Sequence, residues 1–334
     1  MITRGLLRCL HLFLCCLGGI GLASAQTLPG FTLIGENWTY NPGDGGAVIS
    51  GILSKPSTNG PLPAILISHG LGGSAVGFAQ PKAREMTNWG AVCIGPNYTH
   101  TNNSNPPENE GWCPENSRRA RACLTILASL GYVDTNRIAA YGNSMGAFAT
   151  AGLCGAISNQ IKVAAITAGG TSGTSNPDYA APATQEVAGI TAPFLMLHGT
   201  TDTTVPPAQS ATLQTILTSN SISNDRVLFD GIGHDLHNNP ATRDEVYERI
   251  HAWFTQWGLF GRPPAPTLTI TSTNAGTQFK LTWNRSSVLT TIESSTNANR
   301  IFSPIGCVTN GFEYTVPAPT GSTAHGFYRL KQND

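Results

Sequence analysis

The chain has 334 residues, of which 11% are charged and 40% are hydrophobic, and its 19 Lys and Arg residues balance its 19 Asp and Glu residues. This length accommodates one large domain and a smaller one. The apolar fraction is sufficient for a folded core, which excludes a globally disordered chain. A charge-poor chain without net positive charge lacks the electrostatic footprint of a nucleic-acid-binding protein, so we expect no nucleic-acid partner.

The first 25 residues have the pattern of a secretory signal peptide. Arg4 and Arg8 precede an apolar stretch at residues 10–22, which ends in the small residues Ala-Ser-Ala at 23–25. This order of features is typical of a leader that is removed, and we expect cleavage after Ala25. The alternative is a transmembrane anchor, which the short and glycine-interrupted apolar stretch disfavours. The sequence therefore predicts a secreted or periplasmic protein.

Alternating apolar runs and helical patterns occupy the next part of the chain. Eight strands are predicted, at residues 31–40, 47–53, 64–68, 91–95, 137–141, 163–167, 194–197 and 226–229. Five helices are predicted, at residues 75–89, 115–130, 145–157, 207–220 and 242–257. This alternation predicts an α/β fold, in which helices cover both faces of a mostly parallel sheet. The turn-rich segment at residues 41–46 predicts an antiparallel hairpin between the first two strands.

A proline-rich linker at residues 263–266 separates a large domain at 26–262 from a small β-rich accessory domain at 267–334. After the linker the apolar pattern has a period of two, which predicts short strands and a small β-sandwich-like domain. These strands are expected at residues 267–271, 279–283, 291–294 and 326–330. A contact with glycan or the cell envelope and a passive role in stability or secretion both stay open for this domain.

Five cysteines follow the predicted leader, at positions 93, 113, 123, 154 and 307. Because five is an odd number, at least one thiol has no partner within the mature chain. Cys113 and Cys123 flank the start of a predicted helix, and in an oxidising compartment they are the pair that we expect to form a disulfide. No group of Cys and His has the spacing of a zinc site, so no metal is expected.

The predicted strand at residues 137–141 leads into Gly-Asn-Ser-Met-Gly at 142–146 and then into a helix of small residues. A G-x-S-x-G motif between a strand and a helix is typical of a nucleophile elbow. The two glycines allow strand and helix to approach closely, and the helix N-terminus favours developing negative charge. Ser144 is therefore the candidate nucleophile.

Candidates for the acid and the base follow two later strands. Asp202 comes after the predicted strand at 194–197, and His234 after the predicted strand at 226–229. The order Ser, Asp, His is that of the α/β-hydrolase fold. We expect His234 to take the proton of Ser144 during attack on a carbonyl, and Asp202 to orient His234 and stabilise its cation. His237 is a nearby alternative, but the Gly-x-Gly-His approach favours His234.

Backbone amides are expected to form the oxyanion hole. One is the N–H of Met145, directly after the nucleophile, and the other is that of Leu71, in the turn that follows the predicted strand at 64–68. We expect His69 to brace this turn, with a direct catalytic role as the alternative. The loop at residues 98–114, which contains His100 and Trp112, is expected to line the substrate cleft; the alternative is an ordinary surface loop.

These motifs resemble the dienelactone-hydrolase-like branch of the α/β-hydrolase superfamily, and they are also similar to secreted acyl esterases, bacterial polyesterases and prolyl-oligopeptidase catalytic domains. The resemblance covers about residues 31–260. It is carried by the stretches SHGLGG (68–73), YGNSMGAFATAG (141–152), MLHGTTDTTVPP (196–207) and GIGHDLH (231–237). It implies a serine hydrolase that needs no cofactor.

Two departures narrow the expected substrate. Dienelactone hydrolases use a cysteine where this chain has Ser144, which disfavours their substrate. Polyester hydrolases usually have an aromatic residue at the position of Leu71, and His or Trp at the position of Asn143, which disfavours plastic-type polyesters. Only residues 169–192 separate the sixth and seventh predicted strands, and this segment is too short for a substantial cap domain.

The sequence as a whole predicts a secreted carboxylic-ester hydrolase that acts through an acyl-Ser144 intermediate. We expect it to work as a monomer on small-molecule or polymer-linked esters, with an acyl and alcohol preference that the sequence leaves open. One alternative is a peptidase of the prolyl-oligopeptidase type, which normally brings a β-propeller or an amine-recognition site. Another is a non-catalytic binding protein on a hydrolase scaffold, which an intact triad disfavours.

Overall fold

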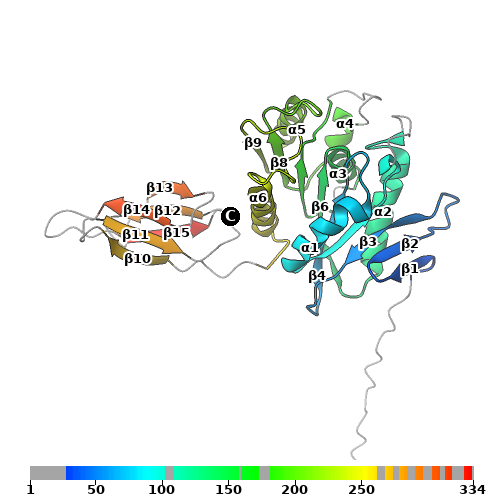
Figure 1. Cartoon of the computed structure of the whole chain (residues 1–334), viewed down its shortest axis with the longest axis horizontal. Coiled ribbons are helices and arrows are strands. Elements are labelled where there is room, and N and C mark those ends of the chain that lie inside the picture. Colours follow the sequence, from blue (N-terminus) through cyan, green and yellow to red (C-terminus); the bar gives the residue numbers. More distant parts are fainter. Residues whose placement is uncertain are drawn as a thin grey trace, which may run out of the picture.

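Figure 1 shows the computed structural model of the chain, which describes residues 28–101, 109–157, 159–172 and 181–261, and six strand segments between 268 and 332. The predicted signal peptide and the proline-rich linker lie outside the described residues, as does the middle of the loop at 98–114. Among the helices that are described, none is both long and apolar enough to cross a membrane.

The large domain is built on a nine-stranded sheet with the order β1-β2-β3-β5-β4-β6-β7-β8-β9. Its strands are β1 (Phe31–Ile34), β2 (Asn37–Tyr40), β3 (Ile49–Ser54), β4 (Leu62–Ser68), β5 (Val92–Pro96), β6 (Val133–Asn143), β7 (Val163–Thr167), β8 (Phe194–Gly199) and β9 (Asn224–Phe229). Six neighbouring strands are parallel, in the order β5, β4, β6, β7, β8 and β9. The other three form an antiparallel edge.

The predicted number of eight strands was wrong by one. The segment expected as a single strand at residues 31–40 is a hairpin of β1 and β2. Gly35, at its tip, has a φ of 61°, which glycine adopts without the steric cost that other residues pay. The hairpin predicted across residues 41–46 is confirmed, because β2 and β3 pair antiparallel.

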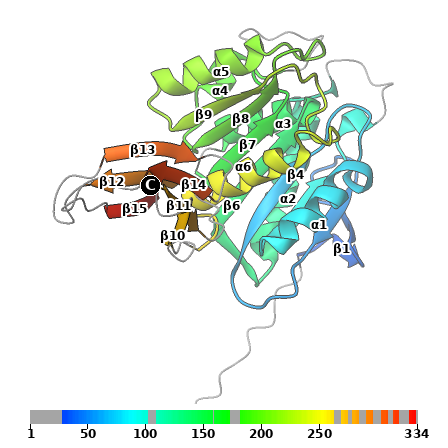
Figure 2. The same ribbon diagram turned by 60° about the vertical axis from the view of Figure 1, so that its left-hand side comes forward.

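Helices cover both faces of the large sheet (Figures 1 and 2). They are α1 (Gln80–Asn88), α2 (Pro114–Ser129), α3 (Met145–Ala156), α4 (Thr184–Val187), α5 (Ala208–Ser219) and α6 (Arg243–Gln256), with a π-helical turn at Ala75–Ala79 and a 3-10 turn at Thr99–Thr101. The sequence did not predict α4, which has only four residues. The carboxylate of Glu186 accepts the backbone N–H of Ala183 at its start, at 2.6 Å.

The core is divided into two layers by the sheet. In β4, Leu66 packs with residues of α2, α3 and α5, whereas Ile65 and Ile67 pack with residues of α1 and α6. Successive side chains of a strand point to opposite faces, so α1 and α6 cover one face and α2, α3 and α5 cover the other. All seven residues of β4 are buried, as expected for a parallel strand between two helical layers.

The last part of the chain contains two antiparallel sheets of three strands each. One has the order β10 (Leu268–Thr273), β11 (Gln278–Trp283), β14 (Glu313–Pro317), and the other β13 (Ser303–Val308), β12 (Thr290–Ser295), β15 (Phe327–Gln332). The four predicted strands are present, whereas β13 and β14 were missed. Pro304 and Gly306 interrupt the strand pattern of β13, and an edge strand tolerates such residues.

The expected disulfide between Cys113 and Cys123 is wrong, because both residues are buried free cysteines. Cys113 is the N-cap of α2 and Cys123 lies on that helix. A helix rises about 1.5 Å per residue, so ten residues separate the two by about 15 Å. A disulfide requires Cα atoms roughly 4.4–6.8 Å apart, and the helix keeps the two thiols too far apart to bond.

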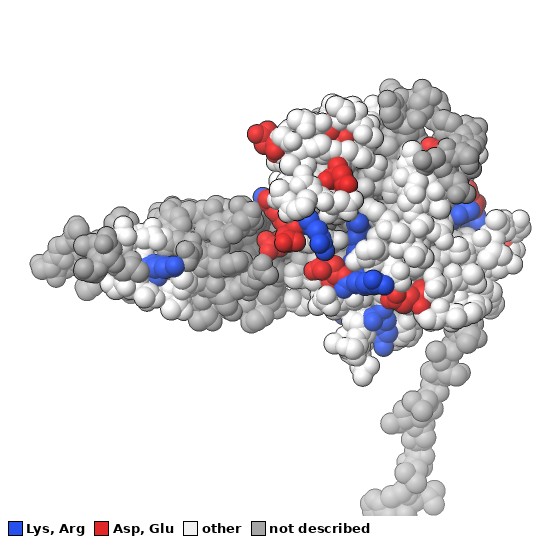
Figure 3. Space-filling model, in the orientation of Figure 1, with Lys and Arg blue, Asp and Glu red and all other residues white. Residues whose placement is uncertain are grey.

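Charged side chains are few on the face drawn in Figure 3, and acidic and basic groups alternate there. Local ion pairs also occur within helices, such as that of Arg249 with Glu245 on α6 at 2.6 Å. On that face the described residues form no broad area of one sign.

Candidate active site

Four turns meet at the carboxyl edge of the parallel strands. The register pairs Ser68, at the end of β4, with Gly142 near the end of β6. It also pairs Gly199 and Phe229, the last residues of β8 and β9. Parallel strands present their carboxyl ends at one edge of a sheet, which is where α/β folds place their ligands. The turns that carry the candidate oxyanion donor, nucleophile, acid and base therefore lie along one edge.

Ser144 occupies the sharp turn between β6 and α3, with φ 55° and ψ −123°. Such a backbone conformation is strained for a residue with a Cβ atom, and strain of this kind is found at functional sites. A Cβ atom on Gly146 would overlap the carbonyl oxygen of Ser68, and one on Gly142 would overlap that of Gly146. The motif therefore needs both glycines because strand, helix and the β4 turn touch there.

The predicted nucleophile, base and acid form one hydrogen-bonded chain. His234 Nε2 lies 2.8 Å from Ser144 Oγ, and His234 Nδ1 lies 2.8 Å from Asp202 Oδ2. Because a carboxylate accepts hydrogen bonds, Nδ1 carries the proton and Nε2 accepts the hydrogen bond of the serine hydroxyl. The His234 side chain is 25% exposed, whereas that of Asp202 is fully buried.

The Asp202 carboxylate is held by more donors than the sequence indicates. Its Oδ1 accepts the backbone N–H groups of Thr204 and Val205, both at 2.9 Å. On the other side, His198 Nε2 lies 3.2 Å from Oδ2. His198 is buried at the end of β8, and sequence reasoning did not select it as a site residue. The spacing His-x-x-x-Asp around the turn after β8 is the signal that was available.

The turn after β4, residues 68–73, lies against the nucleophile. A Cβ atom on Gly70 would lie 3.2 Å from that of Ser144. Gly72 N–H donates to the carbonyl of His100, and Gly73 N–H donates to that of Gly70. Among the described residues no acceptor takes the N–H of Leu71. We call residues 68–73 the oxyanion turn.

Met145 presents the second predicted donor. It is the first residue of α3, and the first N–H groups of a helix have no partner within it. The carbonyl of Ser144 accepts the N–H groups of Ala147 and Phe148. The N–H of Met145 lies at the N-terminal end of the helix, before these bonds begin. Within the part of the chain that the structure describes, nothing accepts its hydrogen bond.

Two neutral imidazoles brace the oxyanion turn. His69 Nδ1 donates to the carbonyl of Gly70 at 2.9 Å, and its Nε2 accepts the N–H of Tyr98 at 3.0 Å. His100 Nε2 donates to the carbonyl of His69 at 2.9 Å. Burial lowers the pKa of His69 to about 4 and that of His100 to about 3. The expectation that His100 lines the cleft is wrong, because the residue is fully buried behind this turn.

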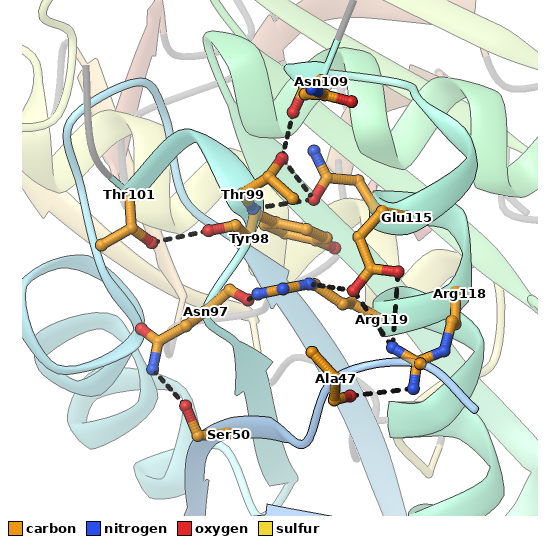
Figure 4. A network of polar contacts seen from close by, with 12 residues as sticks. Ala47, Ser50, Asn97, Tyr98, Thr99, Thr101, Asn109, Glu115, Arg118 and Arg119 are labelled. Carbon is orange, nitrogen blue, oxygen red and sulfur yellow. Dashed lines mark hydrogen bonds and ion pairs between the residues drawn. The ribbon is translucent and has the colours of Figure 1, made fainter. Parts of the chain in front are cut away.

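The segment that carries His100 is itself anchored to neighbouring elements (Figure 4). Arg119 donates to the carbonyl of Asn97 at 2.6 Å and to the carboxylate of Glu115 at 2.9 Å. The side-chain amide of Asn97 donates to Ser50 at 3.0 Å and accepts the N–H of Ala75 at 2.8 Å. Thus α2, β3 and the turn before α1 all fix the support of the oxyanion turn.

Trp112, the other aromatic residue expected at the cleft, is partly buried against α3. An added Cβ atom on Gly152 would overlap its indole ring, and its Nε1 donates to Glu186 at 3.0 Å. The indole therefore links the end of the loop at 98–114 to α3 and α4.

His237, the alternative to His234, lies behind the nucleophile elbow. Its Nε2 contacts the hydroxyl groups of Tyr141 and Thr167, and Thr167 donates to Asn143 Oδ1 at 2.8 Å. Burial lowers the pKa of His237 well below its usual value. This buried imidazole supports the residue before Ser144, whereas His234 contacts the serine itself.

Solved structures with a similar overall structure identify the fold. A Klebsiella pneumoniae protein assigned as a dienelactone hydrolase superposes with a TM-score of 0.55 and 18% identity, over 66% of this chain and 98% of the other. Esterase 2 from Thermogutta terrifontis, solved after phosphonylation by sarin, gives 0.52 and 16%, over 64% and 91%. The chain has the α/β-hydrolase fold.

Peptidases share this α/β-hydrolase fold over a smaller part of their length. A puromycin-hydrolysing peptidase from Mycobacterium tuberculosis matches with a TM-score of 0.52 and 18% identity, over 63% of this chain and 37% of the other. Residues 165–259 match the model of the prolyl oligopeptidase family. A sequence comparison with curated proteins finds no match. Together with the site geometry, these findings support a serine hydrolase and leave the choice between ester and peptide bonds open.

Proposed function

We propose that the protein is a secreted serine hydrolase of carboxylic esters that acts through an acyl-Ser144 intermediate. The observation that carries the proposal is the hydrogen-bonded chain from Ser144 Oγ through His234 to Asp202, with both links at 2.8 Å. A nucleophile, a base within hydrogen-bond reach and a group that orients the base are the parts that nucleophilic catalysis needs. Secretion rests on the leader pattern of the first 25 residues.

Acylation begins when Ser144 Oγ attacks the ester carbonyl and its proton passes to His234 Nε2. The resulting imidazolium is stabilised by Asp202, which accepts the hydrogen bond from Nδ1. Attack converts the carbonyl into a tetrahedral intermediate with a negatively charged oxygen. This oxygen accepts hydrogen bonds from the backbone amides of Leu71 and Met145. Removal of one such donor typically costs about 10²–10³ in kcat.

The intermediate then collapses as His234 returns the proton to the leaving alcohol, and the acyl group stays on Ser144. Water takes the place of the alcohol, loses a proton to His234 Nε2 and attacks the acyl carbonyl. The second tetrahedral intermediate then collapses as His234 returns the proton to Ser144 Oγ. This step releases the carboxylic acid and restores the Ser144 hydroxyl. Every step uses groups of the chain and water, so the proposed reaction needs no cofactor.

Ester hydrolysis is favoured over peptide hydrolysis by the extent of the structural match. The chain spans 98% and 91% of the dienelactone-hydrolase-like protein and the esterase, but 37% of the puromycin-hydrolysing peptidase. The second candidate is a peptidase, which the match of residues 165–259 to the prolyl oligopeptidase family favours. We further propose small-molecule or polymer-linked esters as substrates, and a contact with glycan or the cell envelope for the C-terminal strands.

The test is hydrolysis of p-nitrophenyl esters from acetyl to long acyl chains, together with p-nitroanilide peptides, by the wild type and by Ser144→Ala. We expect ester turnover that the variant loses, and a chain-length profile that measures the acyl site. Turnover of the anilides alone would replace the esterase proposal with the peptidase. If the wild type is folded, as judged by circular dichroism, but hydrolyses neither the esters nor the anilides, both the esterase and the peptidase proposals are rejected.

A further inference from the structure

We infer that His198 is a second imidazole on the acid of the triad, a positioning residue that sets the charge which Asp202 presents to His234. The inference rests on the proposed function of this site. It starts from one contact that the hydrolytic mechanism above does not use, the approach of His198 Nε2 to Asp202 Oδ2 at 3.2 Å.

The surroundings of His198 fix which of its nitrogens carries the proton. Nε2 also lies 2.9 Å from the carbonyl oxygen of Val205, so both of its neighbours are acceptors. Nε2 must therefore be the protonated nitrogen, which hydrogen-bonds to the Val205 carbonyl and faces the Asp202 carboxylate. The other nitrogen, Nδ1, is buried and has no hydrogen-bond partner among the described residues, which leaves the ring no competing anchor.

The imidazole is held in its neutral form. Burial lowers the pKa of His198, and the nearby Arg226 guanidinium lowers it further, whereas the Val205 carbonyl and Asp202 act in the opposite direction. Arg226, on β9, is itself occupied by Ser210 Oγ at 2.8 Å and the carbonyl of Pro207 at 2.9 Å. His198 thus acts on Asp202 as a hydrogen-bond donor without a full positive charge.

The fully buried Asp202 side chain thus accepts three hydrogen bonds and faces the N–H of His198 as a fourth polar contact. Oδ1 takes two backbone N–H groups, and Oδ2 is shared between the two imidazoles, His234 and His198. A donor on Oδ2 draws negative charge away from His234, and it also fixes the carboxylate plane that orients the base. Without the N–H of His198, the Asp202 carboxylate would interact more strongly with His234 and would stabilise the protonated form of that base.

The test compares His198→Leu, which keeps the volume and removes the donor, with His198→Gln, whose side-chain amide returns an N–H near the same place. Met196→Ala is the matched control, because Met196 is buried two residues earlier on β8 and its truncation destabilises the same strand. We expect kcat/KM to fall about 10-fold or more in His198→Leu. The acid limb of its pH profile should move to higher pH, and His198→Gln should recover most of both losses.

A second readout does not require turnover. The imidazole N–H resonance of His234, observed by NMR with labelled histidine, should change in His198→Leu and stay in place in Met196→Ala. If the wild type shows no Ser144-dependent turnover, the proposed function fails, and this resonance still decides the role of His198. An acid limb and a resonance that are the same in His198→Leu and Met196→Ala would overturn the inference and leave His198 as a core residue.

Discussion

The two turns that contact Ser144 are held in place by different means. The oxyanion turn rests on His69 and His100, two buried neutral imidazoles that donate to backbone carbonyls. The histidine loop, residues 230–234, reaches the serine through the partly exposed His234 and is held by hydrogen bonds with the turn that follows β8. Thr201 N–H donates to the carbonyl of Ile232, and Gly231 N–H donates to the hydroxyl of Thr200.

This difference follows from what each turn supplies. The oxyanion turn offers a backbone amide, which cannot be adjusted once the chain is folded, so its direction has to be fixed by buried partners. The histidine loop offers a side chain that must exchange protons with substrate, alcohol and water, so it needs access to the surface. Histidine therefore serves as a structural residue in one turn and as the candidate base in the other.

The largest expected effect separates the two histidine roles. His234→Ala should lower kcat by about 10⁴-fold or more, as removal of a triad base does elsewhere. Its free energy of unfolding should change by less than about 0.5 kcal/mol, because the ring is partly exposed. His69→Ala should instead cost about 2–4 kcal/mol, since it leaves buried backbone groups unpaired. Ester kinetics and urea unfolding measure both, and equal destabilisation by the two variants would refute the distinction.

A pair of glycines tests the same contrast through the backbone. Gly146→Ala should destabilise the protein by about 3 kcal/mol or more, because its Cβ would overlap the carbonyl oxygens of Ser68 and His69. Gly233→Ala, in the histidine loop, meets no atom within 4 Å and should lie within about 1 kcal/mol of the wild type. Thermal unfolding of both variants checks this, and a tolerated Gly146→Ala would mean that elbow and oxyanion turn are not tightly packed.

Acid should weaken the support of the oxyanion turn. The unfolded chain protonates His100 near pH 6.5, whereas burial lowers its pKa to about 3 in the folded protein. Between these values the unfolded state binds more protons, so the free energy of unfolding falls as pH decreases, by up to about 1.4 kcal/mol per pH unit. Urea unfolding between pH 7 and pH 4 measures the slope. His100→Gln should reduce it by about that amount, and an unchanged slope would contradict the neutral buried imidazole.

The smallest effect is expected from the side chain of Leu71, which is 47% exposed. The proposed role of this residue belongs to its backbone N–H. Leu71→Ala keeps that donor and should change kcat for p-nitrophenyl acetate by no more than about twofold. A larger loss with the short acetyl ester would show that the side chain itself shapes the reacting centre. A loss confined to long acyl chains would place Leu71 in the acyl site.

Several parts of this protein were determined by local sequence. The sequence predicted the parallel strands and the five longer helices. Strands that are buried on both faces have continuous apolar runs, and helices that are buried along one side have apolar residues at a helical spacing. Ser144, Asp202 and His234 were predicted from short motifs at strand ends, since parallel strands bring those ends to one edge. The divided first strand, the short α4 and the interrupted β13 left too few residues to form such a pattern.

Only the tertiary structure decided which polar groups meet across the fold. The sequence places His100 in a loop. In the folded protein its side chain is buried against the oxyanion turn, where it hydrogen-bonds to the carbonyl of His69, a residue 31 positions earlier in the chain. The same holds for His237, which lies behind the nucleophile elbow. Motifs specify which residues carry reactive groups, whereas the partners that fix their direction and proton state come from distant segments. Those contacts depend on how helices and turns pack, and no local pattern of the sequence contains them.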